Sequence, residues 1–80
     1  MIESKLRELL APLNPTRLDI TNDSHLHGNP PDSGTHFKVI MVSESFAGLS
    51  RVKRHQLVYG ICAPLLQNPI HALALHLYSP

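Results

Sequence analysis

Histidines are the residues of this sequence best suited to chemistry, because there are 6 of them in 80 residues. Neutral imidazole binds zinc, copper, nickel and iron. His25 and His27 lie in a stretch of turn-forming residues, whereas His71 opens the closing apolar run "IHALALHLY". A histidine of that stretch and His71 make a reasonable pair of metal ligands. Two ligands leave the coordination shell unfinished, so a partner would have to supply the rest.

The closing run contains a second histidine, His76, five residues after His71. In a strand, side chains at this spacing point to opposite faces, and in a helix they lie about 140° apart. The two histidines therefore do not form one site by themselves. A polar ring among Leu and Ala needs a reason. From the residues alone, metal ligation and a structural hydrogen bond to the backbone both remain open for His71.

A basic cluster, "RVKRH", places Arg51, Lys53 and Arg54 at the start of an expected helix. Cations there oppose the helix macrodipole, at a cost on the order of a few tenths of a kcal/mol each. Positive charge at this corner would suit phosphate groups or an acidic protein surface, with Lys38 as a further contact. A solvated helix face is the simpler alternative. There is no GxxG loop and little aromatic interleaving, so the nucleic-acid signal is weak.

Several classes of protein find no support in the sequence. There is no nucleophile beside a base, no carboxylate pair and no phosphate-binding loop, so no enzymatic activity is expected. The single cysteine, Cys62, excludes an internal disulfide and favours a reducing compartment; its place on an apolar stripe predicts a buried thiol. No apolar run approaches the roughly 20 residues that span a bilayer. Because the N-terminus is also unlike a leader, the chain is expected to be cytoplasmic. Its net charge of +1 argues neither for nor against nucleic acid.

The first half of the chain predicts a helix and two strands. Apolar residues recur at helical spacing in "MIESKLRELLAPL", and Pro12 and Pro15 end this helix. "TRLDITND" alternates between apolar and polar residues, as a half-exposed strand does. The long stretch "SHLHGNPPDSGT" is expected to be a loop. "HFKVIMV" is apolar on both faces, which predicts a central strand.

The second half predicts a helix and a closing strand. Ser50 is a plausible N-cap for "RVKRHQLVYGICAPLL", a helix that Pro64 ends or kinks. After Pro69, the run from Ile70 to Tyr78 is expected to be a strand, with His71 on the face of its leucines. With a short turn before the second helix, the order is αββααβ. We expect one α+β (mixed α/β, two-layer) domain over residues 1–80, with a three-stranded mixed sheet packed on helices.

Two long segments, "NPPDSGTHFKVIMVSESFAGLSRVKRHQLVYGICAPL" and "IHALALHLY", resemble the BolA family. The shared features are the Pro-rich loop running into "THFKV", the "VS" and "F.G" pairs, the "RH" of the second helix and "HALAL" in the last strand. The resemblance covers essentially the whole chain. It implies a single BolA-like domain whose fold is similar to a type II KH domain without its GxxG loop.

The resemblance also implies a function. BolA-like proteins pair with monothiol glutaredoxins, and the heterodimer shares a [2Fe–2S] cluster to which the glutaredoxin brings a cysteine and bound glutathione. On this chain the implied ligands are His71 and His27, with His25 as the second choice. The implied role is non-enzymatic, in iron–sulfur cluster trafficking or iron and redox regulation. The alternative is a DNA-binding transcriptional regulator that uses Lys38, Arg51, Lys53 and Arg54.

Overall fold

The computed structural model describes residues 2–24, 36–66 and 68–80. The expected order of elements is observed. Within the described ranges, single 3-10 turns also occur at Ala11–Leu13, Glu44–Phe46 and Ala63–Leu65. The main elements are α1 (Ile2–Leu10), β1 (Arg17–Asn22), β2 (His36–Val42), α2 (Arg51–Cys62) and β3 (Ala72–Tyr78).

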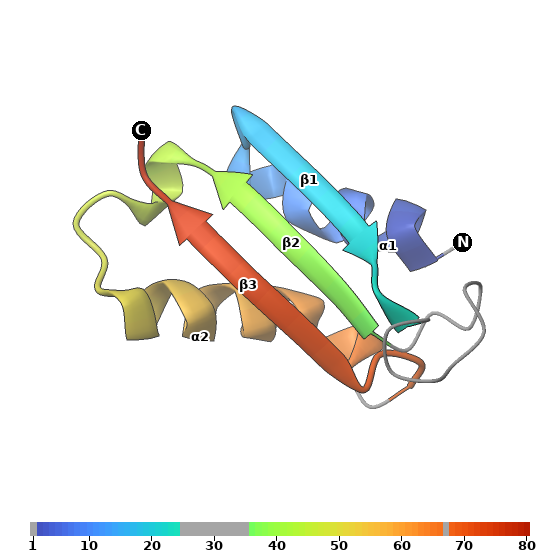
Figure 1. Ribbon diagram of the computed structural model, residues 1–80. Helices are drawn as coiled ribbons and strands as arrows, with labels where there is room; N and C mark the ends of the chain where they lie inside the picture. The colour runs from blue at the N-terminus through green and yellow to red at the C-terminus, as the bar shows by residue number, and fades with distance from the viewer. Residues whose placement is uncertain (1, 25–35, 67) are drawn as a thin grey trace.

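The three strands form one mixed sheet in the order β1-β2-β3 (Figure 1). β1 runs antiparallel to β2, and β3 runs parallel to it. In this register Val39 of β2 lies between Ile20 of β1 and Leu75 of β3. The predictions of a mixed three-stranded sheet and of a central strand at β2 are therefore confirmed.

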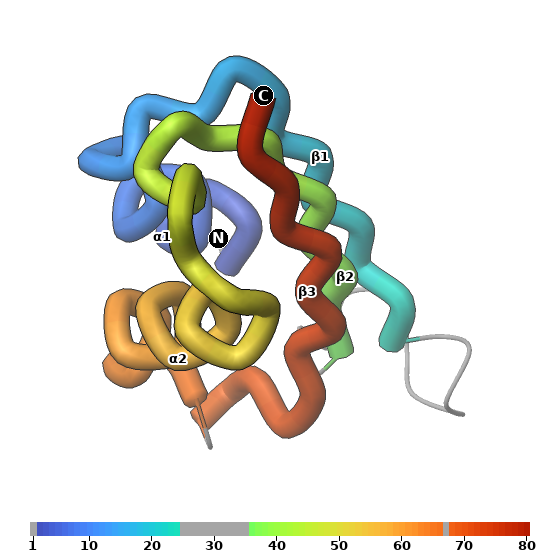
Figure 2. Tube along the Cα trace, turned by 90° about the vertical axis from the view of Figure 1, so that its left-hand side faces the viewer, coloured from blue at the N-terminus to red at the C-terminus, as the bar shows by residue number. Residues whose placement is uncertain are grey.

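Both helices lie on the same side of the sheet, which Figure 2 shows edge-on. Side chains alternate along a strand, so every second residue of β2 and β3 faces the helices. The buried core consists of Leu6, Leu10, Phe37, Val39, Met41, Phe46, Val58, Cys62, Leu65, Ile70, Leu73, Leu75 and Leu77. Two predictions are confirmed here, the two-layer α+β architecture and the burial of the Cys62 thiol. No helix in the described residues is long and apolar enough to cross a membrane.

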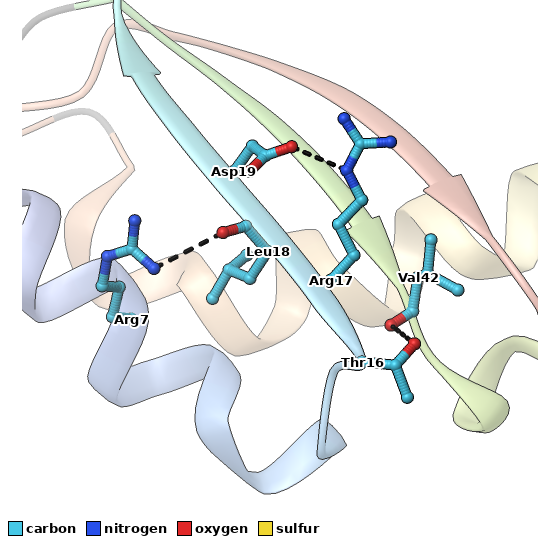
Figure 3. Close-up of polar contacts among 6 residues, drawn as sticks. All are labelled: Arg7, Thr16, Arg17, Leu18, Asp19 and Val42. Atoms are coloured by element: carbon cyan, nitrogen blue, oxygen red, sulfur yellow. Dashed lines mark hydrogen bonds and ion pairs between the residues drawn. The ribbon is translucent and has the colours of Figure 1, made fainter.

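Polar contacts attach β1 to its neighbours on both sides (Figure 3). The Arg7 guanidinium of α1 reaches the carbonyl oxygen of Leu18 at 3.5 Å, the long limit of a hydrogen bond. Directly before β1, the backbone N–H of Thr16 donates to the carbonyl oxygen of Val42 at 2.9 Å. The Thr16 hydroxyl reaches the same oxygen at 3.4 Å. These contacts fix the start of β1 against the end of β2.

A buried serine, Ser43, connects the end of β2 to the first helical segment. Its hydroxyl donates to the carbonyl oxygen of Leu13 at 2.6 Å and accepts from the backbone N–H of Ser45 at 3.1 Å. Because one side chain satisfies groups on two segments, it sets the position from which the chain turns toward α2. Gly48 sits in that turn with φ +77°, a conformation that side-chain-bearing residues rarely adopt.

Helix α2 begins and ends at the residues that the sequence indicates. The Ser50 hydroxyl accepts from the backbone N–H of Lys53 at 3.2 Å, so the N-cap prediction is confirmed. The α-helix ends at Cys62, and Pro64 lies in the 3-10 turn that follows. Proline has no N–H to continue the α-helical ladder, which explains the change.

The last strand begins at Ala72, not at Ile70 as the sequence predicts. Ile70 is buried, and its backbone N–H donates to the carbonyl oxygen of Leu65 at 3.0 Å. It also forms an isolated β-bridge with Leu66. Because its backbone closes the turn after α2, Ile70 does not join the sheet. His71 lies in the bend before β3 and is exposed, so the expectation that it shares a strand face with the leucines is wrong.

Candidate functional site

His71 lies beside an open apolar groove between the end of α2 and the start of β3. The groove has a volume of about 530 Å³. Buried Ile70 fixes the backbone directly before the histidine, whereas the imidazole itself is exposed. A group of another molecule therefore has access both to the ring and to the apolar wall next to it. The groove is lined by Tyr59, Leu66, Ile70, His71, Ala72, Leu73 and Ala74.

Tyr59 connects α2 to β3 at the edge of this groove. Its phenolic hydroxyl donates to the carbonyl oxygen of Leu73 at 2.7 Å. Its ring meets the ring of His55 edge-on, with centroids 6.4 Å apart. Tyr59 could not be identified from the sequence, because its role depends on the approach of α2 to β3, which no local pattern indicates.

The described residues on either side of 25–35 are joined by hydrogen bonds. The backbone N–H of His36 donates to the Ser24 hydroxyl at 3.1 Å. In return, the backbone N–H of Asp23 donates to the carbonyl oxygen of His36 at 2.8 Å. The segment therefore leaves and re-enters the described structure at one place, where β1 ends and β2 begins.

This place is at the same end of the sheet as His71. His36 pairs in register with Ala72, the residue that directly follows His71. His25 and His27 lie outside the described residues, so their positions relative to His71 stay a prediction. The described residues that flank the segment, Ser24 and His36, lie next to the start of β3, which His71 directly precedes.

The described residues do not build a metal site unaided. Across 2–24, 36–66 and 68–80, no three His, Cys, Asp or Glu side chains come together as a metal would require. The thiol of Cys62 is buried in the core, where desolvation raises its pKa to about 11. Metals bind the thiolate, so this thiol is a poor ligand. A metal bound at His71 would therefore need ligands from outside the described residues.

The predicted basic residues do not form one surface. Arg51 and Lys53 are exposed in the first turn of α2. Arg54 is half-buried and engaged: its Nε donates to the carbonyl oxygen of Leu49 at 3.0 Å and its Nη1 to that of Leu77 at 3.1 Å. Lys38 alternates with the buried residues of β2, so it lies on the sheet face opposite the helices.

A division of charge along the chain also escaped the sequence analysis. Residues 45–80 contain no Asp or Glu, and their three Lys and Arg residues give them a formal charge of +3. Residues 1–44 contain all six acidic residues and four basic ones, which gives −2. The two parts sum to the net charge of +1, which conceals the asymmetry. A count by segment would have revealed it.

Known proteins resemble this chain in sequence and in structure. The BolA-like protein family model matches residues 9–80. BolA-like protein 1 of Bos taurus is 42% identical over 80 residues, which cover 99% of this chain and 59% of the bovine protein. The chain thus spans little more than half of that relative's length.

A bacterial relative and a solved structure extend the comparison. The DNA-binding transcriptional regulator BolA of Vibrio cholerae is 47% identical over 79 residues, covering 99% of this chain and 72% of that protein. The structure of BolA1 from Arabidopsis thaliana matches with a TM-score of 0.91 and 38% identity, covering 100% of this chain and 93% of the other. The sequence, the order of elements and the three-dimensional fold agree, and the chain belongs to the BolA family.

Proposed function

We propose that this chain is a non-enzymatic partner of a monothiol glutaredoxin and co-ligates a [2Fe–2S] cluster. Its ligands are His71 and a histidine of the segment 25–35, with His27 as the first choice and His25 as the second. The role is in iron–sulfur cluster trafficking or in iron and redox regulation. One observation carries the proposal: the exposed imidazole of His71 lies at the end of the sheet where the two ends of that segment meet.

The ligand chemistry is consistent with this role. Histidines in place of two cysteine thiolates reduce the negative charge of a cluster and raise its reduction potential. Only neutral imidazole binds iron, so a site of this kind weakens as pH falls through the range in which histidine is protonated. Half of a ligand set on each protein also accounts for the lack of a complete metal site among the described residues.

The groove next to His71 supports the docking of a partner. Its walls come from Tyr59, Leu66 and Leu73, and it is open to solvent. Apolar surface that surrounds a ligand group favours protein contact, and exclusion of water around a cluster influences its potential. A glutaredoxin that brings its cysteine and glutathione to His71 would cover this groove.

The test is a visible circular dichroism titration of this protein into a cluster-loaded monothiol glutaredoxin with glutathione. Wild-type protein should change the cluster spectrum and saturate near one equivalent. His71→Ala should leave the spectrum unchanged. His76→Ala is the matched control, because His76 is an exposed histidine of β3 that lies outside the groove beside His71, and this variant should leave the titration intact.

The variant His27→Ala identifies the second ligand. Loss of the spectral change in this variant supports His27, whereas a normal titration transfers the role to His25. The cluster proposal fails if wild type leaves the spectrum unchanged and no complex forms. It also fails if His71→Ala titrates as wild type does.

A second candidate function is DNA binding. It is favoured by the name of the relative from Vibrio cholerae and by the absence of acidic residues from 45–80. Exposed Arg51 and Lys53 would contact phosphates, and Arg54, whose Nε and Nη1 bind carbonyl oxygens of the chain, would contribute only through Nη2.

Salt dependence separates this candidate from the first. On duplex DNA, the logarithm of the binding constant should fall with the logarithm of salt concentration with a slope of about −0.9 per phosphate contacted. Arg51→Ala and Lys53→Ala should each reduce that slope, and His71→Ala should not change it. Binding that is insensitive to salt and to both basic residues would exclude this mode.

A further inference from the structure

A second groove lies at the other end of β3, against the start of α2. Its volume is about 460 Å³, within the range of small-molecule sites. It is lined by Leu49, Arg51, Arg54, His55, Leu75, His76, Leu77 and Tyr78. Neither candidate function uses this groove as a cavity.

The polar part of the groove is cationic. Arg51, Arg54, His55 and His76 line it, and no acidic side chain does. The two ion pairs found among the described residues, Glu3 with Arg7 and Arg17 with Asp19, involve other parts of the chain. The groove also lies at the N-terminus of α2, where the macrodipole favours negative charge. Its positive charge is therefore not neutralised by the described part of the chain.

The side chain of Arg54 is held in a position from which it can donate a hydrogen bond to a bound anion. Its Nε and Nη1 are fixed by the carbonyl oxygens of Leu49 and Leu77. Its Nη2 makes no hydrogen bond to any described residue, and the side chain lines the groove. A guanidinium that is already ordered loses little further entropy on binding, and its planar donors match the oxygens of phosphate.

The other part of the groove is apolar and aromatic. Leu49 and the small accessible parts of Leu75 and Leu77, which are otherwise buried in the core, form the wall, and Tyr78, which also lines the groove, is 52% exposed. A free inorganic anion would leave this wall in contact with water. The combination of an ordered guanidinium at Arg54, a second cation at Arg51 and an apolar wall favours an anion with an organic body.

We propose that this groove binds a small organic phosphate, whose phosphate contacts Arg51 and Arg54 and whose organic part packs against Leu75, Leu77 and Tyr78. Phosphate groups also occur in nucleic acid, but a duplex backbone would engage Lys53 as well as Arg51. Lys53 is exposed in the same helical turn and does not line the groove. The pair Arg51→Ala and Lys53→Ala therefore distinguishes the two sources of phosphate.

The experiment follows backbone amide shifts by NMR while the protein is titrated with phenyl phosphate, inorganic phosphate or duplex DNA. Phenyl phosphate should saturate shifts at Leu49, Leu75 and Leu77 with a dissociation constant of about 1 mM. Arg51→Ala should weaken this binding roughly tenfold, because a charge-assisted hydrogen bond is lost. Lys53→Ala should change it by less than about twofold, because exposed charges outside the groove are screened.

Three results would overturn the proposal. The first is an absence of saturable shifts with phenyl phosphate. The second is equal binding of inorganic and phenyl phosphate, because the apolar wall would then contribute nothing. The third is binding of the duplex alone, with both variants weakening it equally. Unchanged amide shifts in α1 and β1 will show that Arg51→Ala is folded, and its exposed side chain makes no hydrogen bond within the described structure.

Discussion

The hydroxyl of Tyr59 donates a 2.7 Å hydrogen bond to the carbonyl oxygen of Leu73, and so holds α2 against the start of β3, two residues beyond His71. Tyr59→Phe removes this bond and keeps the ring. We expect the free energy of unfolding to fall by about 1 kcal/mol, since the carbonyl loses its partner. If the cluster proposal is correct, the visible circular dichroism change with glutaredoxin should also weaken.

Urea denaturation measures the first effect, and Tyr78→Phe is its control. The Tyr78 side chain is exposed, and its hydroxyl makes no hydrogen bond within the described structure, so that variant should be as stable as wild type. Equal losses in the two variants would mean that the bond from Tyr59 contributes nothing measurable.

Arg54 should contribute to stability more than its neighbour Lys53. Arg54→Ala removes two hydrogen bonds from a charged group to the backbone, one to Leu49 and one to Leu77. We expect the free energy of unfolding to decrease by about 2 kcal/mol. Arg54→Lys should recover only part of this, because a single ammonium cannot reproduce the planar geometry.

Lys53→Ala is the matched control for the loss of a cation. Its side chain is exposed, so the expected change in the free energy of unfolding is within about 0.5 kcal/mol. Thermal and urea unfolding of the three variants test this order of stability. If Arg54→Ala were as stable as Lys53→Ala, the two carbonyl contacts would not hold in solution.

Ser43 should be sensitive to truncation although it lines neither groove. Ser43→Ala removes the hydroxyl that accepts a hydrogen bond from the backbone N–H of Ser45. It also removes the donor of the 2.6 Å hydrogen bond to the carbonyl oxygen of Leu13. We expect a loss of about 2 kcal/mol in the free energy of unfolding, because buried polar groups then lack partners. Ser45→Ala removes only an exposed 3.4 Å contact and should cost less than about 0.5 kcal/mol.

The buried thiol of Cys62 should make the free energy of unfolding depend on pH. Burial raises the pKa of its thiol from an ordinary 9.0 to about 11. Between these values the unfolded chain loses the thiol proton and the folded chain keeps it. The free energy of unfolding should therefore decrease as pH rises from 9 towards 11. Over the same range, Cys62→Ala should show a smaller decrease, since other titrating groups are common to both proteins.

Urea denaturation of both proteins across this range measures the difference. Reaction with a thiol reagent at neutral pH gives an independent check, because the thiolate is the nucleophile. The native protein should react only at the rate at which it opens. Fast labelling of the native protein would contradict the burial of the Cys62 thiol. The same would follow if the free energies of unfolding of wild type and Cys62→Ala changed equally with pH.

Local patterns in the sequence were sufficient for most of the fold. Apolar residues on both faces of "HFKVIMV" predicted the central position of β2, and side-chain chemistry predicted the cap at Ser50. The start of β3 was predicted wrongly, because the backbone bond from Ile70 to Leu65 depends on how the chain turns after α2. No periodicity in the sequence reports such a turn.

The candidate sites were less predictable than the fold. The sequence indicated that His71 and His76 do not form one site. In the structure His71 lies in the bend before β3, and His76 lies on the solvent face of β3. The roles of Tyr59 and Arg54 needed the distance between α2 and β3, which only tertiary packing sets. The ligand role of His27 or His25 stays a prediction. The charge division between the two parts of the chain was present in the sequence and needed only to be counted.

The carbonyl contacts made by helix side chains have a consequence for self-association. β1 and β3 are the outer strands of the sheet, and such strands normally offer free backbone groups to a strand of another molecule. Here Arg7 reaches the carbonyl of Leu18 on one side, and Arg54 and Tyr59 engage those of Leu77 and Leu73 on the other. Because both borders are partly occupied from within, extension of the sheet between molecules is disfavoured, and concentrated solutions should resist β-type aggregation.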